Sequence, residues 1–324
     1  MSDEHSLRVV TLNVHDFADA EHEQNFARLE AFLRPLNADV VCFQEAIENT
    51  FRLRSREADL DLSDRTQSDL HVFGARCGFP HVVFGSAQTS FGVAVLSRWP
   101  FVKVRCATLS RHRVLLITAI AKHGRCFTVC NIHLNHRLEK NRIEEIQAAL
   151  AVLQSDDAAK TLAIDAGNGK LYFDFPPADE RNFCDPRNAN SAPSPLPLVD
   201  APPLTLVPGA ILCGDFNALS VEEHYLPEQW RHIVESRRSV KWEEPRTDVW
   251  RLMMREGWCD CWLAQNTARL ADPTLKRTTV WAKSRIDYVF ALGDALKAAL
   301  RQCEVHETDG LTDHDAVVAD FEFE

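Results

Sequence analysis

The feature that most constrains this chain is a series of short apolar, strand-like runs, each lying next to a small cluster of polar residues. Runs such as 8–12 and 38–43 are typical of buried strands. Ligand sites tend to form where neighbouring strands of a sheet end. We therefore expect one shared rim, at the C-terminal ends of the runs, formed by Asn13, Gln44-Glu45, Asn131-x-His133, Asp215-x-Asn217 and Asp313-His314.

The order of the runs predicts a mixed α/β arrangement. Apolar residues at helical spacing over 26–36 separate the first two runs, which predicts a β-α-β opening. His123-Gly124 lies between two later runs and is a hairpin signal, so antiparallel pairing is expected there. The remaining pattern predicts strands over 81–84, 92–96, 114–121, 127–134, 209–214, 280–281, 286–291 and 316–321, and helices over 70–78, 139–154, 228–236 and 247–256.

Two stretches interrupt this pattern. The residues near 49–69 are charged and poorly patterned, and nine of the 15 prolines fall between 176 and 208, where no regular element can persist. The strand pattern resumes at Gly209 without a shift in composition. We therefore predict a single domain over 1–324 with surface insertions near 49–69 and 164–208. A linker between two domains is the alternative.

Net charge limits the choice of partner. The 36 Lys and Arg against 47 Asp and Glu leave a formal charge of −11, so the bulk field repels nucleic acid and anionic lipid. A polyanionic partner would need a local basic groove or a bound cation. Basic runs exist over 52–56 and 231–241, the second flanked by Trp230 and Trp242. A nucleic-acid strand could stack there, and a solvated helix with its Trp residues in the core is the alternative.

The composition, 45% hydrophobic and 26% charged, is that of an ordinary globular protein. The segment from Met1 to His5 is acidic and lacks the charged and apolar regions of a signal peptide, and no apolar run reaches the roughly 18 residues of a membrane span. We expect an intracellular protein, cytoplasmic or nuclear. The 10 cysteines include no Cys-x-x-Cys pair, so reduced and mostly buried thiols are expected.

The residue types at the rim complement one another. Carboxylate and amide oxygens suit a hard cation, two imidazoles can bind anionic oxygens, and one Asp can act on a water molecule. Each cluster alone is a weak signal, because a buried Asn or His is more often structural than catalytic. Together they supply what phosphoester hydrolysis needs.

Seven motifs in order make the chain resemble the endonuclease/exonuclease/phosphatase superfamily. They are Thr11-Leu-Asn13, Gln44-Glu45, Gly92-Val-Ala-Val-Leu-Ser97, Asn131-Ile-His133-Leu134, Gly214-Asp-Phe-Asn217, Ser284-Arg-Ile-Asp287-Tyr and Thr312-Asp-His314. The resemblance spans nearly the whole chain. It implies a four-layered α/β sandwich, with two mixed β-sheets packed face to face and helices outside, and a divalent-metal site at one rim.

The resemblance also implies a role for each motif residue. Glu45 would be the main Mg²⁺ ligand, with Asn13 and Asp313 binding the metal or a metal-bound water, and Mn²⁺ is expected to substitute. Asp215 would orient and deprotonate the attacking water. Asn217 would hold Asp215 or a phosphate oxygen in place.

Two histidines would bind the phosphate in this scheme. His133 and His314 would donate hydrogen bonds to its non-bridging oxygens, and Asp287 would fix the tautomer of His314. Pairing of Asp287 with Arg285 on the surface is the alternative. His15 lies two residues beyond Asn13 on the same strand face, so it either reaches the rim or packs behind it. Gln44 and Arg285 are expected to support the rim from behind.

Positions at which this sequence departs from the patterns of known subfamilies narrow the range of expected substrates. Ala46 after Gln-Glu disfavours apurinic endonucleases, and Cys213 before Gly-Asp disfavours inositol polyphosphate 5-phosphatases. The Asn-x-His-Leu form is similar to that of tyrosyl-DNA phosphodiesterase 2 and the deadenylase-type nucleases. The leading hypothesis is a Mg²⁺-dependent phosphodiesterase or nuclease acting on single-stranded or end-exposed nucleic acid or a nucleic-acid adduct. The alternatives are a phosphatase or phosphodiesterase for a small lipid, inositol or sugar phosphate and, remotely, a non-catalytic scaffold. The sequence leaves the oligomeric state open.

Overall fold

The computed structural model describes residues 3–18, 25–48, 68–87, 91–155, 172–174, 204–280 and 282–324. The insertions expected near 49–69 and 164–208 lie largely outside these ranges. The single-domain arrangement with two insertions therefore stays a prediction.

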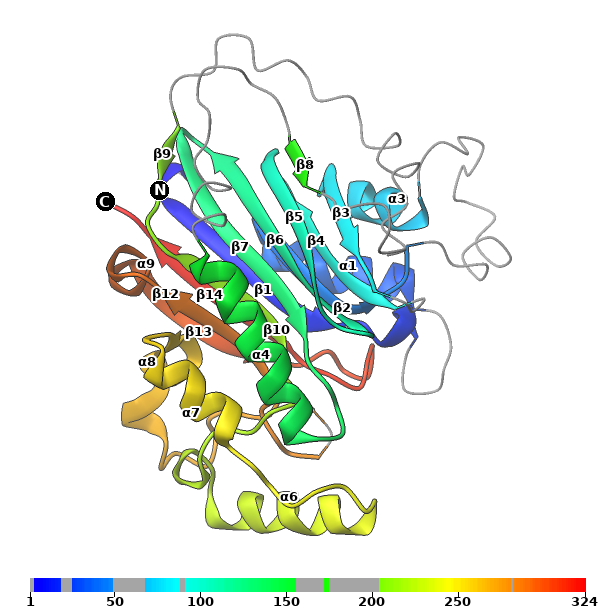
Figure 1. Ribbon diagram of the computed structural model, residues 1–324, viewed down its shortest axis with the longest axis vertical. Helices are drawn as coiled ribbons and strands as arrows, with labels where there is room; N and C mark the ends of the chain where they lie inside the picture. The colour runs from blue at the N-terminus through cyan, green and yellow to red at the C-terminus, as the bar shows by residue number, and fades with distance from the viewer. Residues whose placement is uncertain are drawn as a thin grey trace.

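Two mixed β-sheets form the centre of the molecule (Figure 1). The first has the order β13-β14-β1-β2-β4-β3, in which only β1 and β2 run parallel. Its strands are β1 (Ser6–Asn13), β2 (Val40–Ala46), β3 (His81–Gly85), β4 (Gly92–Ser97), β13 (Leu300–His306) and β14 (Ala316–Glu322).

The second sheet has the order β11-β12-β10-β7-β6-β5-β8, with β9 pairing alongside β7. The pair β7 and β10 is parallel, whereas β12 runs antiparallel to β10. Its strands are β5 (Phe101–Ser110), β6 (Arg113–Lys122), β7 (Arg125–His133), β8 (Tyr172–Asp174), β9 (Thr205–Leu206), β10 (Ala210–Asp215), β11 (Cys259–Asp260) and β12 (Asp287–Leu292).

Helices cover the outer face of each sheet (Figure 1). Helices α1 (Phe26–Leu36) and α3 (Asp69–Arg76) share one apolar cluster with the first sheet, and α4 (Glu139–Gln154) and α7 (Asp248–Arg255) share another with the second. A third cluster fills the space between the sheets. These layers confirm the predicted four-layered α/β sandwich. The other helices are α6 (Pro227–Ser239), α8 (Cys261–Asn266) and α9 (Asp294–Ala299), with 3₁₀ turns at Asp3–His5, His15–Phe17, Glu222–His224 and Thr267–Arg269.

The continuous apolar runs arise because the central strands are buried on both faces. Val9 packs between the sheets while the next residue, Val10, packs against the helices. In the same way, Cys42 packs between the sheets and Phe43 packs against the helices. A strand with one wet face would alternate apolar and polar residues, so the unbroken runs signal burial in the middle of a layered fold.

Most expected elements are present with small shifts at their ends, and the helix predicted over 139–154 has those bounds. Strand β5 was not predicted because charged residues such as Lys103 and Arg105 interrupt its apolar residues. Strand β13 and helices α8 and α9 were also not predicted. Of the strand expected over 280–281, Val280 makes one isolated bridge to His314, and residue 281 lies outside the described ranges.

Two expectations from composition concern thiols and membranes. The nine cysteines among the described residues are all free, and most are buried. Within the same residues, no helix combines the length and the apolar character needed to cross a membrane.

A buried pair of amide side chains ties the two sheets together near the rim. Gln44 of β2 donates through Nε2 to Asn131 Oδ1 of β7 at 2.7 Å, and neither side chain is exposed to solvent. Asn131 Nδ2 in turn donates to the carbonyl oxygens of Phe43 and Ala94 in the first sheet, both at 2.8 Å. Because buried polar groups must be paired, these bonds fix how one sheet sits on the other.

Replacing Asn131 with Ala should therefore destabilise the protein strongly. The change leaves the Gln44 amide and two carbonyl oxygens buried without these partners, which should lower the free energy of unfolding by roughly 3 kcal/mol. Urea unfolding followed by circular dichroism measures the effect. Gln302→Ala is the control, because Gln302 is an exposed amide on a strand and its loss should change stability by less than about 0.5 kcal/mol. Equal effects in the two variants would contradict the bridging role.

Candidate functional site

Four strands deliver polar residues to one end of the sandwich. Strands β1 and β2 run parallel and place Asn13 opposite Gln44. Strands β7 and β10 run parallel and place His133 opposite Asp215. The structure therefore brings together clusters that lie far apart in the sequence, as expected for a shared rim.

Further residues reach this end from antiparallel strands. Asp287 begins β12 and lies opposite Asp215 in the register of the sheet. Asp313 and His314 precede β14, which runs antiparallel to β1. The expectation that Asp313-His314 follows the C-terminal end of a strand is wrong. The pair reaches the rim because an antiparallel strand begins where its neighbour ends.

A β-bulge directs Glu45 to the rim. The register between β2 and β4 shifts between Gln44 and Ala46, and Glu45 has a φ of 51°. In a regular strand, Glu45 would point to the face opposite Gln44, toward the helices. The bulge instead leaves its carboxylate 30% exposed, with Oε1 at 3.9 Å from Nε2 of His133.

The Gly-Asp-Phe-Asn motif shapes the end of β10. Gly214 has a φ of 151°, and a Cβ there would lie 1.9 Å from the carbonyl oxygen of Ile132 in β7. Only glycine lets the two strands approach this closely. Asn217, at a φ of 50°, turns the chain back so that its backbone N–H donates to Asp215 Oδ1 at 2.8 Å and its Nδ2 donates to the Leu134 carbonyl at 3.1 Å.

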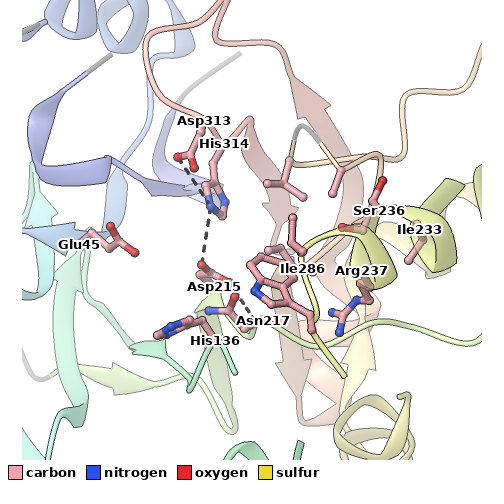
Figure 2. Close-up of a pocket in the computed structure, with 15 residues that line it drawn as sticks. Glu45, His136, Asp215, Asn217, Ile233, Ser236, Arg237, Ile286, Asp313 and His314 are labelled. Carbon is pink, nitrogen blue, oxygen red and sulfur yellow. Dashed lines mark hydrogen bonds and ion pairs between the residues drawn. The ribbon is translucent and has the colours of Figure 1, made fainter. Parts of the chain in front are cut away.

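Asp215 lies at the centre of the cluster (Figure 2) and is 2% exposed. Its Oδ2 accepts a hydrogen bond from Asn13 Nδ2 at 3.1 Å, and lies 3.5 Å from Nε2 of His133 and 3.9 Å from Nε2 of His314. Burial, followed by the negative charge of Asp287, raises the pKa of Asp215 to about 7. A carboxylate with such a pKa is suited to accept a proton near neutral pH.

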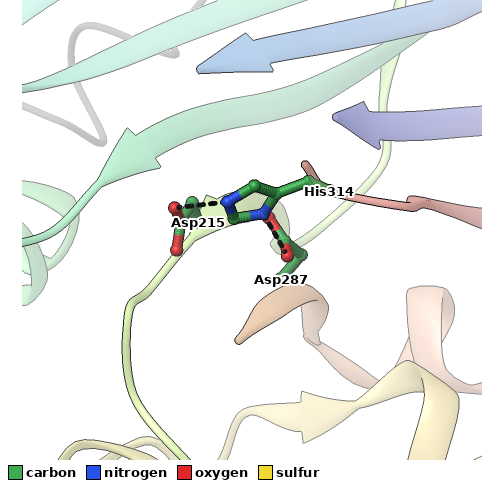
Figure 3. Close-up of side chains that lie close together, drawn as sticks. All are labelled: Asp215, Asp287 and His314. Atoms are coloured by element: carbon green, nitrogen blue, oxygen red, sulfur yellow. Dashed lines mark hydrogen bonds and ion pairs between the residues drawn. The ribbon is translucent and has the colours of Figure 1, made fainter. Parts of the chain in front are cut away.

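His314 and Asp287 form a buried pair (Figure 3). Nδ1 of His314 lies 2.9 Å from Oδ2 of Asp287, which is fully buried. Burial alone would lower the pKa of His314, but the carboxylates of Asp287, Asp215 and Asp313 outweigh it and raise the pKa to about 10. His314 is therefore an imidazolium at neutral pH, with Nδ1–H donating to Asp287.

Arg285 is not part of this pair, so the alternative pairing of Asp287 with Arg285 is wrong. The guanidinium of Arg285 is 2% exposed and binds both carboxylate oxygens of Asp260, at 3.0 and 2.8 Å. It also lies over the rings of Trp262 and Tyr288. Arg285 therefore supports the core beside the site and does not reach the rim.

His133 has the opposite protonation state, because burial and the neighbouring Arg113 both disfavour its charged form. Nη1 of Arg113 lies 3.1 Å from Nδ1 of His133. A guanidinium can only donate, so Nδ1 accepts and the proton lies on Nε2, which faces Asp215. Burial and then the charge of Arg113 hold the pKa of His133 well below its ordinary value. Arg113 was not predicted, because a basic residue at the start of a strand carries no pattern of its own.

His15 differs from its expected position. Strand β1 ends at Asn13, and His15 lies in the 3₁₀ turn that follows, at a φ of 43°, so it does not share a strand face with Asn13. Its backbone N–H donates to Asn13 Oδ1 at 3.0 Å, and its Nδ1 lies 3.9 Å from Asp313 Oδ1. Gln44 lies behind the rim in its bond to Asn131, as expected.

The oxygen donors at the rim fit a hard divalent cation. Glu45 and Asp313 line the same pocket as Asp215, and their side chains are 30% and 36% exposed. Partly exposed carboxylates beside an amide such as Asn13 are the donor chemistry that Mg²⁺ selects.

A second grouping brings ligand atoms of Asp215, Asp287 and His314 within 4.8 Å of one another. The shortest contact within this trio is the 2.9 Å hydrogen bond between Nδ1 of His314 and Oδ2 of Asp287, so the three side chains form a hydrogen-bonded charge cluster.

Solved structures with low sequence identity share this fold. An endonuclease/exonuclease/phosphatase from Beutenbergia cavernae is 19% identical with a TM-score of 0.56, over 98% of this chain and 72% of that one. The human Nocturnin catalytic domain is 15% identical with a TM-score of 0.58, over 99% and 94%. Caenorhabditis elegans TDP2 is 15% identical with a TM-score of 0.50, over 99% and 100%.

Sequence comparison gives the family directly. No curated protein sequence matches significantly. Residues 10–314, however, match the model of the Endonuclease/Exonuclease/phosphatase family. Its members include nucleases and phosphatases and are generally metal-dependent phosphoester hydrolases. Because this match runs from β1 to His314, the chain belongs to the Endonuclease/Exonuclease/phosphatase family.

Proposed function

We propose that this protein is a Mg²⁺-dependent phosphodiesterase that acts on nucleic acid or a nucleic-acid adduct. The observation that carries the proposal is one buried carboxylate, Asp215, with Nε2 atoms of two histidines within 3.9 Å. The two rings differ in charge, because His314 is held protonated and His133 neutral. A base between two hydrogen-bond donors is the arrangement that hydrolysis of an anionic ester needs.

Asp215 is proposed to accept the proton of the attacking water. As the water oxygen bonds to phosphorus, its proton passes to Asp215 and the ester oxygen leaves with the electron pair of the broken P–O bond. The hydrogen bonds from Asn13 and from the Asn217 backbone hold the carboxylate in one orientation. Fixed orientation matters because phosphoryl transfer depends mainly on positioning.

The two histidines are proposed to bind the non-bridging phosphate oxygens. His314 would donate from Nε2 as a cation, since Asp287 occupies its Nδ1. His133 would donate from Nε2 as a neutral ring, since Arg113 occupies its Nδ1. Both donors are fixed before the substrate arrives, and preorganised donors stabilise the charge that builds up on the phosphate.

The metal is proposed to be Mg²⁺, held by Glu45 and Asp313 with Asn13 as an amide ligand or a holder of metal-bound water. When bound, it would neutralise phosphate charge and stabilise the leaving oxygen. Mn²⁺ prefers similar oxygen ligands, so it should substitute.

The electrostatics favour a substrate with few phosphates. A net charge of −11 disfavours a nuclease that grips a long duplex, because such binding neutralises many phosphates at once. The basic run over 231–241 lies mostly on α6, where Arg238 is already paired with Glu244. Single-stranded or end-exposed nucleic acid therefore suits the protein better.

Asp215→Asn should abolish turnover without unfolding the protein. The amide cannot take the proton of water, so kcat for a phosphodiester should fall by at least about 100-fold. Hydrolysis of bis(p-nitrophenyl) phosphate in Mg²⁺, with an EDTA control, measures this, and calorimetric Mg²⁺ titration should show binding largely retained. Asp309→Asn, the same change at an exposed residue, should keep full activity. Wild-type kcat in Asp215→Asn would rule out Asp215 as the base.

A substrate panel should separate the nuclease from the phosphatase branch. We expect EDTA-sensitive cleavage of plain or 5′-tyrosyl single-stranded oligonucleotides, lost in Asp215→Asn, because their exposed ends need few basic contacts. Electrophoresis of end-labelled oligonucleotides shows the cleavage and its polarity. Lipid, inositol and sugar phosphates are tested in parallel by phosphate release. Activity confined to those small esters would move the protein to the alternative function with the same site residues.

Asp287→Asn should lower the pKa of His314 from about 10 toward its ordinary value of 6.5. The sign follows because the lost carboxylate stabilises the protonated ring. Titration of the His314 ring signals by NMR in the metal-free protein measures the change. Asp313→Asn removes a more exposed carboxylate and should have a smaller effect. A titration near pH 10 in Asp287→Asn would show that Asp287 does not hold the charge.

A further inference from the structure

The pocket at the rim has two unlike sides. Its volume is about 260 Å³. On one side lie the polar residues already described, and on the other side Ile286 and the residues of α6 face them (Figure 2). We call the second side the apolar wall, which consists of Ile233, Val240, Trp242, Val280, Ala282 and Ile286.

The apolar wall leaves hydrophobic surface open beside a site for a charged group. Val240 is 45% exposed and Trp242 is 44% exposed. They are two of the five large apolar side chains that are exposed among the described residues, and both line this one pocket. Exposed apolar surface gathered in a concave site marks a place where a ligand is bound.

Trp242 is held in place from several directions. Its backbone N–H donates to the Arg237 carbonyl at 2.9 Å, and the Arg237 guanidinium lies 5.9 Å from its ring centroid. The next residue, Glu243, accepts hydrogen bonds from the side chain of Arg142 and, at 2.6 Å, from the backbone N–H of Glu139 at the start of α4. The ring therefore costs little entropy to order when a ligand packs on it.

The sequence left two alternatives for the Trp residues beside the basic run, and the structure separates them. Trp230 is partly buried and packs against the cluster that contains Ile233 and Ile286. Trp242 is open to the pocket. Trp230 therefore supports the core, while Trp242 is available to a ligand.

We propose that the apolar wall binds a flat aromatic ring carried by the phosphoester, next to the scissile phosphate and stacked on Trp242. This inference rests on the proposed function, which places the phosphate beside Asp215 and His314. A nucleobase and a phenol share the required chemistry, an apolar face and a polar edge. The pocket, at about 260 Å³, is large enough for such a ring, because a cavity of roughly 150 Å³ already admits a benzene molecule.

An aromatic ring fits the observations better than an aliphatic chain. Indole rings stack on flat π-systems and gain energy beyond the buried area. The cationic Arg237 and the hydroxyl of Ser236 also line the pocket, and they suit the polar edge of a base or phenol. A saturated lipid chain would offer neither group a polar contact beyond those it already makes, to the His232 ring from Ser236 and to the Glu243 carbonyl from Arg237.

The test compares phosphate monoesters as product-like ligands, measured by calorimetric titration of the Mg²⁺-loaded full chain. Phenyl phosphate and thymidine 5′-phosphate carry aromatic rings, cyclohexyl phosphate carries an apolar ring that is not flat, and ethyl phosphate carries neither. Inorganic phosphate reports on the phosphate site alone. Trp242→Ala removes the stacking ring, Trp242→Phe keeps one, and Leu206→Ala shortens an exposed apolar side chain on β9 that does not line the pocket.

Phenyl or thymidine phosphate should bind wild type about tenfold more tightly than ethyl phosphate, the size expected for one stacked ring. Trp242→Ala should remove this preference, while Trp242→Phe and Leu206→Ala should retain most of it. Tighter binding of thymidine 5′-phosphate would indicate a nucleobase as the ring, and tighter binding of phenyl phosphate would indicate a phenol.

Equal binding of aromatic and ethyl esters, or equal binding of cyclohexyl and phenyl esters, would overturn the stacking proposal while leaving the phosphate site intact. A preference that survives in a folded Trp242→Ala would overturn it as well. Failure to bind inorganic phosphate, together with no diester hydrolysis, would instead reject the proposed function and this inference with it.

Discussion

The hydrogen bond between Gln44 and Asn131 is the contact on which the candidate site depends, because the site is divided between the two sheets. One sheet contributes Asn13 and the bulged glutamate beside it, and the other contributes Asp215. Apolar packing between sheets is non-directional and tolerates small shifts. The amide bridge and the bond from Asn13 to Asp215 do not, since each has a defined distance and angle. These polar contacts therefore hold the rim side chains of the two sheets in a fixed arrangement.

The two buried histidines differ in charge because a carboxylate binds Nδ1 of one and a guanidinium binds Nδ1 of the other, while burial favours the neutral form of both. His314 binds a buried carboxylate through Nδ1, so its proton is retained there and the ring is cationic. His133 binds Arg113 through the same ring nitrogen, so it stays neutral. Both rings nevertheless present an N–H at Nε2 toward Asp215. The site thus gains two donors while carrying one imidazolium. Burial, followed by the charge of Asp287, raises the pKa of Asp215 to about 7, and the positive charge of His314 acts in the opposite direction.

The family resemblance implied the two-sheet sandwich. The sequence itself predicted a mixed α/β arrangement and most rim residues, because strand ends and polar clusters are local patterns. It could not predict what depends on contacts between distant segments. Arg113 matters only through its contact with His133, and Arg285 was misjudged because its partner Asp260 lies 25 residues away in the chain. The position of His15 was wrong for a local reason, since the chain leaves β1 in a turn with positive φ that the residue types do not signal.

The polar rim and the apolar wall are built on different kinds of structure. Much of the polar rim lies at the ends of central strands whose side chains are buried on both faces. Half of the apolar wall lies on α6 and the turn after it. These segments contact the sandwich through the small cluster around Ile233 and Ile286 and through the bonds of Glu243 to α4. Ile286 belongs to the wall and directly precedes Asp287. It is therefore the point at which the position of α6 can influence the pair of Asp287 and His314, whereas Trp242 can be changed without altering the residues proposed to act on phosphate.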